Sequence, residues 1–164
     1  MKTRMAVAIA SFTLLTNIAS VSGHNGVFPE KGQKADWLKA IELYNAGHHK
    51  ELAGQLDQAI ELYERARRMY PYDADFYDNL AELYKEHKND TKRAVALFRE
   101  GIQQEPYDAH IRARYGNCLF EQGKLQQAEA MLNSASRLNK DPGLERRINT
   151  VRTMVQDARK KKQR

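Results

Sequence analysis

The chain has few of the residues that interrupt helices, with four prolines and nine glycines among 164 residues. Runs of β-branched residues, which favour strands, are also rare. Ala, Leu, Glu, Gln, Lys and Arg dominate instead, and these residues favour helices. The composition therefore predicts an all-α protein, and the length suits one modest domain.

Cysteine is nearly absent, since Cys118 is the only one. An intramolecular disulfide is therefore excluded. A single thiol in an exported protein could pair between chains. A small residue buried in a helix is the simpler interpretation, and it is the one we adopt.

The motifs of common enzymes are missing too. The sequence has no Gly-rich phosphate loop, no nucleophile elbow and no HExxH motif. His48 and His49 are adjacent, so their side chains diverge by about 100° on a helix and cannot hold one ion by themselves. The remaining histidines lie in separate segments. We predict a protein that is not an enzyme and that carries no metal and no cofactor.

No acidic residue precedes Glu30, and the first segment differs from the rest of the chain. Residues 1–22 begin with the basic stretch MKTR, continue with an apolar run and end in small residues. This pattern is typical of a secretory signal peptide, and we predict cleavage after Ser22 or Gly23. The alternative is an uncleaved membrane anchor at residues 5–21, which several Ser, Thr and Asn residues make weakly apolar. We therefore expect an exported protein, periplasmic or secreted.

Charge is unevenly distributed along the mature chain. Residues 137–164 contain ten Lys or Arg against three Asp or Glu, whereas residues 23–136 contain fifteen against eighteen. An acidic body therefore carries a basic tail. The tail lacks the interleaved aromatic residues that stack on bases, so we expect no nucleic-acid binding. Weak contact of the basic C-terminus with anionic lipid headgroups is the functional alternative to a solvated helix end.

The tetrapeptide PYDA occurs twice, at residues 71–74 and 106–109, and its flanks repeat as well. Three units of similar length follow one another at residues 40–73, 74–108 and 109–142. Each unit divides into two amphipathic halves separated by a short polar break. The second half of each unit has a small, a large and a second small residue at helical spacing: Ala59, Tyr63 and Ala66; Ala94, Phe98 and Gly101; Ala128, Leu132 and Ala135.

PYDA predicts a turn between helices. Pro71 and Pro106 cannot continue a helix, and Asp73 and Asp108 can cap the next one. This helix–turn–helix unit, with a Gly or Ala, a central Ala, an aromatic residue and a terminal Pro, resembles the tetratricopeptide repeat (TPR) family. The resemblance implies an all-α, right-handed α-solenoid of three helical hairpins. One departure is Arg112, which stands where the first helix of a unit usually has a large apolar residue.

A stack of repeats needs an end cap. Asp141 and Pro142 fit the start of a further helix. An apolar stripe then runs along it: Leu144, Ile148, Val151, Val155 and Ala158. We predict a capping helix at residues 142–160 and a basic tail at 161–164. We predict that the three units and the start of their first helix span residues 36–142, with Asp36 as the cap of that helix. The segment before them, at residues 23–35, is predicted to be flexible.

The resemblance also implies a concave groove lined by the first helix of each unit, in which a partner segment binds. The residues implied at this partner-binding groove are Tyr44, His48, Glu51, Asp75, Asp78, Glu82, Glu86, Asn117 and Phe120, with Ile41, His110 and Ala113 beside them. The four carboxylates of the second unit are spaced to form one stripe, which we expect to be exposed. A partner with basic residues next to apolar ones would suit it. Lys and Arg, which hold a partner's terminal carboxylate in some family members, are missing at Tyr44, His48 and Ala113, so we expect no such clamp.

These observations predict a non-enzymatic module that binds a protein or peptide, an adaptor or assembly factor in the cell envelope. Two alternatives stay open. One is a self-assembling structural unit that stacks through its terminal faces. The other is a membrane-tethered subunit of a secretion or enzyme complex. The short basic start and the lack of disulfides favour a bacterial periplasm.

Overall fold

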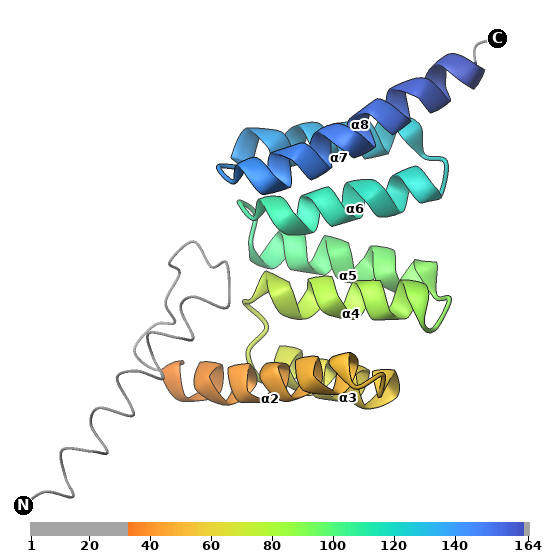
Figure 1. Ribbon diagram of the computed structural model, residues 1–164. Helices are drawn as coiled ribbons and strands as arrows, with labels where there is room; N and C mark the ends of the chain where they lie inside the picture. Colours follow the sequence, from red (N-terminus) through yellow and green to blue (C-terminus); the bar gives the residue numbers. More distant parts are fainter. Residues whose placement is uncertain (1–32, 163–164) are drawn as a thin grey trace, which may run out of the picture. The chain divides into compact units, whose positions relative to one another are not determined.

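The computed structural model describes residues 33–162, and this part of the chain contains seven helices and no strand. The prediction of an all-α protein is confirmed. The helices, labelled in Figure 1, are α2 (Lys34–Leu52), α3 (Leu56–Met69), α4 (Ala74–Glu86), α5 (Thr91–Gln104), α6 (Ala109–Glu121), α7 (Leu125–Leu138) and α8 (Pro142–Lys162).

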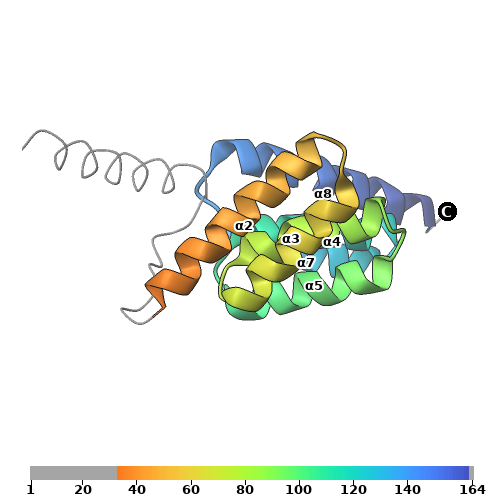
Figure 2. The ribbon, with the colours of Figure 1, turned by 90° about the horizontal axis from the view of Figure 1, so that it is seen from below.

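The helices form three hairpins and one additional helix. Consecutive helices pair as α2 with α3, α4 with α5 and α6 with α7, and α8 packs on α7 and α6. Figure 2 shows the first hairpin, α2 and α3, side by side from below. The first helices α4 and α6 also contact each other directly. Each hairpin falls on one of the three sequence units, except that α2 begins at Lys34, before the unit at 40–73 and inside the segment at 23–35 that was predicted to be flexible.

The turns between hairpins are built as the PYDA motif predicts. α3 ends at Met69 and α5 at Gln104, just before the two prolines. The carboxylate of Asp73 accepts a hydrogen bond of 3.1 Å from the backbone N–H of Asp75. The carboxylate of Asp108 accepts one of 2.9 Å from the N–H of Ile111. Both predicted caps are therefore confirmed.

The two ends of the helical stack are capped differently. Asp141 accepts hydrogen bonds from the backbone N–H groups of Gly143 and Leu144, both at 2.9 Å, which confirms its role at the start of α8. The role expected of Asp36 is wrong, because α2 begins at Lys34 and Asp36 lies inside its first turn. Gln33 occupies the cap position and makes no capping hydrogen bond with its side chain.

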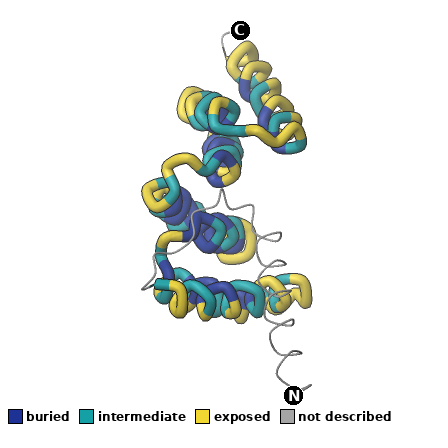
Figure 3. The backbone as a smooth tube through the Cα atoms, turned by 90° about the vertical axis from the view of Figure 1, so that its left-hand side faces the viewer, coloured by how far each residue is buried: buried dark blue, intermediate teal, exposed yellow. Residues whose placement is uncertain are grey.

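Each hairpin is closed by a small residue on one helix facing a large one on the other. A Cβ at Gly47 would lie 2.7 Å from the ring of Tyr63, and one at Gly116 would lie 2.8 Å from Leu132. Tyr63 and Leu132 are almost completely buried. Figure 3 shows that buried positions gather on the helix faces that meet. The small–large–small pattern therefore marks the contact between the helices of a hairpin.

α8 covers the last hairpin with its apolar stripe. Leu144, Ile148 and Val155 are buried. Val151 and Ala158 are partly buried and pack against the core. The helix runs to Lys162, two residues beyond the predicted end. Cys118 on α6 is fully buried, as the simpler interpretation of a lone cysteine expects.

The predicted signal peptide at residues 1–22 and most of the segment at 23–35 lie outside the described residues. Within residues 33–162, no helix combines the length and the apolar character that crossing a membrane requires.

Candidate functional site

Side chains that join one first helix to the next define one surface of the stack. Tyr44 on α2 bonds to Asn79 on α4, with 2.8 Å between the phenol oxygen and the amide nitrogen. Two ion pairs connect α4 with α6. Asp78 pairs with Arg114 at 3.0 Å, and Lys85 pairs with Glu121 at 3.2 Å. We call the side of α2, α4 and α6 that carries these residues the first-helix face.

Tyr44 is the aromatic residue at one end of this face. It is half-buried, and its ring lies 5.3 Å from the rings of both Tyr63 and Phe76. Its hydroxyl accepts the hydrogen bond from Asn79. Burial, together with the charges of Asp75 and Asp73, raises the pKa of Tyr44, so the phenol stays protonated at physiological pH. Its hydroxyl hydrogen is therefore available for a further acceptor.

His48 and Glu51 differ in what they offer to a partner. His48 is exposed and lies 3.8 Å from Glu51. Glu51, however, accepts a hydrogen bond of 2.7 Å from the hydroxyl of Tyr63 on α3. Glu51 therefore helps to close the first hairpin, whereas His48 is open to solvent.

Asp78 corrects the expectation of four exposed carboxylates. Its side chain is only 8% exposed, and its Oδ2 atom lies 3.0 Å from Nε of Arg114. The other oxygen, Oδ1, is buried without a hydrogen-bond partner. Burial above all, with Asp75, Glu82 and Asp108 nearby, raises the pKa of Asp78 to about 8, although Arg114 opposes the shift. A substitution to Lys here would bury a second cation next to Arg114 and would disturb the fold.

Lys85, which the sequence reasoning missed, lies among the other carboxylates. Its ammonium group is 3.2 Å from Glu82, 3.5 Å from Glu86 and 3.2 Å from Glu121. Its side chain is 11% exposed. Burial lowers its pKa, but Glu82 and Glu121 outweigh burial and raise it overall. The stripe of acidic residues is therefore partly neutralised from within, and the spacing of three between Glu82 and Lys85 is the signal that could have shown this.

The remaining residues predicted for the groove differ in how far they are exposed to solvent. Asp75 and Asn117 are half-buried, and Asn117 donates a hydrogen bond of 2.9 Å to Glu121. Phe120 is half-buried and packs against the core. Among the neighbours, Ile41 is buried, Ala113 is half-buried and His110 is exposed. The structure thus connects Glu82, Glu86 and Asn117 through Lys85 and Glu121. Asp78 forms a separate ion pair with Arg114, and Glu51 bonds to α3.

Arg112, the residue that departs from the repeat pattern, lies partly buried between helices. Its Nε donates a hydrogen bond of 3.2 Å to the hydroxyl of Ser134 on α7. Its Nη1 atom is buried without a partner. Burial lowers the pKa of its guanidinium group, although Asp108 opposes this. This charge lies between α6 and α7 and joins none of the ion pairs above.

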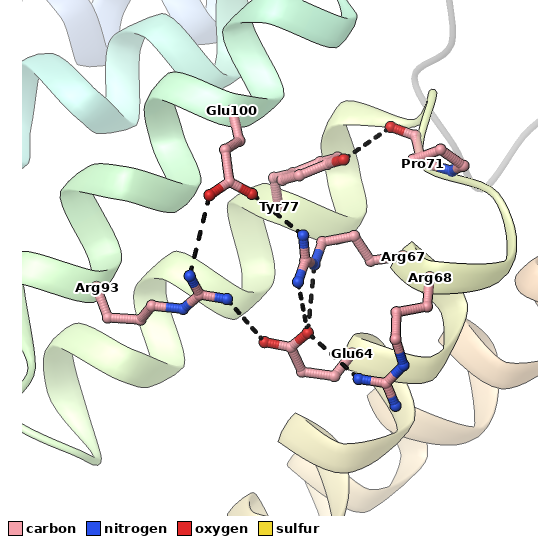
Figure 4. A network of polar contacts seen from close by, with 7 residues as sticks. All are labelled: Glu64, Arg67, Arg68, Pro71, Tyr77, Arg93 and Glu100. Carbon is pink, nitrogen blue, oxygen red and sulfur yellow. Dashed lines mark hydrogen bonds and ion pairs between the residues drawn. The ribbon is translucent and has the colours of Figure 1, made fainter.

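The second helices are linked by a different network, drawn in Figure 4. Arg67 on α3 pairs with Glu64 at 2.8 Å and with Glu100 on α5 at 3.1 Å, and Arg93 on α5 pairs with Glu64 at 3.4 Å. The guanidinium of Arg67 also lies over the ring of Tyr77. These contacts hold the first two hairpins together on the side of α3 and α5.

In the part of the chain that the structure describes, no three His, Cys, Asp or Glu side chains come together as metal ligands. The charged residues of the first-helix face are instead arranged as ion pairs and hydrogen bonds. This arrangement suits non-covalent recognition by a polar surface.

Comparison with known proteins agrees with this architecture. Two sequence models described as tetratricopeptide repeat match the chain, one at residues 37–83 and one at residues 87–146. Together they span all three hairpins and the start of α8. No curated protein matches the sequence.

Several solved structures share the fold. The first TPR of Spaghetti (RPAP3), bound to the HSP90 peptide SRMEEVD, has a TM-score of 0.66 and 20% identity, with 74% of this chain and 94% of that chain covered. The Yersinia enterocolitica type III secretion chaperone SycD, in complex with a peptide of the translocator YopD, has a TM-score of 0.66 and 19% identity, with 76% and 95% covered. The Sgt2 TPR domain from Aspergillus fumigatus has a TM-score of 0.63 and 16% identity, with 74% and 82% covered.

Proposed function

This chain belongs to the tetratricopeptide repeat family, and from this premise we propose that it is a non-enzymatic module that binds a protein or peptide segment along its first-helix face. The single observation that carries the proposal is the composition of this face. Half-buried aromatic rings, Tyr44 and Phe120, lie on helices that also carry polar groups fixed by bonds between helices. Aromatic anchors beside preorganised polar groups are typical of protein-binding surfaces.

Two of the similar structures contain a bound peptide, an HSP90 peptide in one and a translocator peptide in the other. They support peptide binding by this fold. The chemistry of the peptide that this chain binds has to be inferred from its own residues. Sequence identities of 19–20% do not show that the binding side chains are shared.

The module works in the cell envelope, as an adaptor or assembly factor, after export through the signal sequence at residues 1–22. The N-terminal sequence pattern is the support for this part of the proposal. Mass spectrometry of the native protein tests it, because export with cleavage predicts a mature N-terminus at residue 23 or 24. An intact N-terminus in a membrane fraction would instead support the alternative of a tethered subunit.

Affinity capture from the native cells tests partner binding. The wild type would be compared with Glu86→Lys, which reverses an exposed charge on α4. The matched control is Glu61→Lys, which reverses an exposed charge on α3, outside the first-helix face. We expect a partner to be retained by the wild type and by Glu61→Lys and to be weakened by Glu86→Lys. Equal retention by all three would place the binding site elsewhere on the protein.

Self-assembly is the alternative from another class. Light scattering over a range of protein concentrations separates the two, since an adaptor keeps one mass and a stacking unit grows. A mass that rises with concentration, together with the loss of captured partners, would favour the structural unit.

The basic end of α8 suggests an additional weak contact with anionic membrane surfaces. Four consecutive cations, at residues 159–162, end the helix. Arg159 pairs with Glu129 and Lys160 lies 3.8 Å from Asp157, which leaves part of this charge uncompensated. Co-sedimentation with vesicles containing phosphatidylglycerol, against pure phosphatidylcholine vesicles, tests this contact. It should disappear at high salt, where charges are screened.

A further inference from the structure

We propose that the first-helix face accepts a lysine or arginine side chain of the bound segment at Asp78, with the cation donating a hydrogen bond to Oδ1. This inference rests on the proposed function and names the chemistry of the partner. It starts from an imbalance at Asp78. One carboxylate oxygen is held by Arg114 at 3.0 Å, and the other is buried and lacks a hydrogen-bond partner.

A buried carboxyl oxygen without a hydrogen-bond partner costs free energy whether or not the group carries a proton, because it has lost water without gaining another partner. In native proteins such atoms are few, and each calls for an explanation. A hydrogen-bond donor supplied by a partner would satisfy Oδ1. The position of Asp78 supports this source, because the ion pair with Arg114 places it between α4 and α6 on the first-helix face.

The charges around Asp78 favour a cationic donor over a neutral one. Asp75 and Glu82 on α4, and Asp108 at the cap of α6, act on Asp78 as negative charges. Arg114 acts on it as a positive charge. Glu82 is shared with Lys85. The local balance remains negative, so a Lys or Arg side chain gains more here than an amide or a hydroxyl. A metal ion fits less well, because the described residues gather no three metal-ligating side chains.

Arg114 offers a route of entry. Oδ1 is covered in the free protein, so a partner side chain has to displace part of its cover. The Arg114 side chain is 49% exposed, and the ion pair with Asp78 is the one polar contact that the described residues show for it. Movement of Arg114 toward solvent gives up an ion pair with a buried carboxyl, and the incoming cation compensates this loss.

Binding at this position is coupled to a proton. Because the pKa of Asp78 is raised to about 8, the free protein holds a proton on this carboxyl at neutral pH. A cation beside Oδ1 stabilises the ionised form, so binding releases the proton. The affinity therefore rises with pH below about 8, by up to roughly tenfold per pH unit for one released proton.

Selection from a random twelve-residue peptide library displayed on phage tests the proposal without a known partner. The library would be selected on the wild type, on Asp78→Asn and on Glu61→Gln, which removes an exposed charge from α3, outside the first-helix face. We expect peptides from the wild type and from Glu61→Gln to share a Lys or Arg next to apolar residues. Peptides from Asp78→Asn should lack this shared cation. Asn keeps the size of the side chain and an acceptor for Arg114.

The outcomes separate this inference from the proposed function. No enrichment on the wild type would count against peptide binding itself. Enriched peptides without a shared cation, or the same cation selected by Asp78→Asn, would overturn the role of Asp78 and leave the binding function standing. Calorimetry of a selected peptide on the wild type between pH 6 and pH 8 gives a test that needs no variant. A pH-independent affinity would contradict the proposal.

Discussion

Gly101 on α5 lies directly against Tyr77 on α4, since a Cβ at position 101 would come 2.8 Å from the Cβ of Tyr77 and would overlap the end of Ile111. Tyr77 has little room to move. It is 3% exposed, and its hydroxyl donates a hydrogen bond of 2.9 Å to the carbonyl of Pro71. This contact closes the second hairpin and at the same time reaches the third.

Gly101→Ala should therefore destabilise the protein. Alanine gains about 1 kcal/mol of helix propensity over glycine. Overpacking a tight core costs roughly 1–3 kcal/mol. Because the Cβ of Tyr77 cannot swing away like the end of a side chain, we expect a net loss of about 1 kcal/mol. Urea unfolding measures it, with the exposed Gln103→Ala on the same helix as the control. A Gly101→Ala protein more stable than the wild type would mean that Tyr77 and Ile111 can make room for a Cβ at position 101.

The network of Figure 4 gives a second prediction. Glu64 is 14% exposed and pairs with Arg67 and Arg93, so Glu64→Gln leaves two partly buried guanidinium groups with weaker partners. We expect a loss of about 1–2 kcal/mol in the free energy of unfolding. Glu61→Gln, one turn earlier and exposed, should change stability by less than about 0.5 kcal/mol. Similar losses in both variants would mean that the network does not stabilise the contact between the hairpins.

The same network should weaken in acid. Burial raises the pKa of Glu64, but hydrogen bonds and charges from Arg67 and Arg93 outweigh it and hold the pKa below its ordinary value. A carboxyl with a lowered pKa stabilises the fold above the pKa of the unfolded chain and loses this contribution as pH falls. The wild type should therefore lose more stability than Glu64→Gln between pH 5 and pH 3, measured by thermal unfolding. Parallel curves would show that Glu64 contributes nothing to the acid response.

The sequence predicted well those features that depend on neighbours along the chain. The caps Asp73, Asp108 and Asp141 follow from local turn chemistry, because the capping oxygen and its N–H lie two or three residues apart. The burial of Tyr63 in the first hairpin follows from the small–large–small spacing of the repeat. The helices of the three units and the start of α8 at Pro142 could be predicted from the sequence in the same way.

Contacts between helices could not be predicted in the same way. Helical spacing places Asp78 on one face of its helix. It does not say how far neighbouring helices cover that face, and this cover is what buries Asp78. Its partner Arg114 lies on another helix, and no local pattern links the two residues. Lys85 is different, since its spacing from Glu82 within α4 was visible in the sequence. The prediction of an exposed acidic stripe was wrong because it was made from the carboxylates alone, without the cations next to them.

α8 should behave as a structural cap, and its stripe provides a matched pair of variants. Ile148 is 1% exposed, whereas Met154 is 48% exposed on the same helix. Ile148→Ala should cost about 2–5 kcal/mol through lost burial and a cavity. Met154→Ala should stay close to the wild type, because little apolar area is removed from the interior. Denaturant unfolding of both variants tests the cap, and equal stability would mean that α8 adds little to the core.

The raised pKa of Asp78 gives a pH dependence of the opposite sign from that of Glu64. Between the unfolded value of 3.8 and about 8, the folded protein holds a proton on Asp78 that the unfolded chain has lost. The contribution of Asp78 to stability is therefore fully present below the unfolded pKa and declines as pH rises toward 8. Asp78→Asn removes this slope. Relative to the wild type, it should gain more than about 1 kcal/mol between pH 5 and pH 9, since each pKa unit corresponds to about 1.4 kcal/mol.

Urea unfolding of Asp78→Asn and the wild type at both pH values measures this gain, with Glu86→Gln as the exposed control on the same helix. A wild type that tracks Asp78→Asn across this range would mean that Asp78 is ionised in the folded protein. Arg114 would then outweigh burial, and the carboxyl would not need a second cation to hold its charge. The measurement therefore also bears on how a partner binds, because the coupling between binding and proton release requires a carboxyl that is protonated in the free protein.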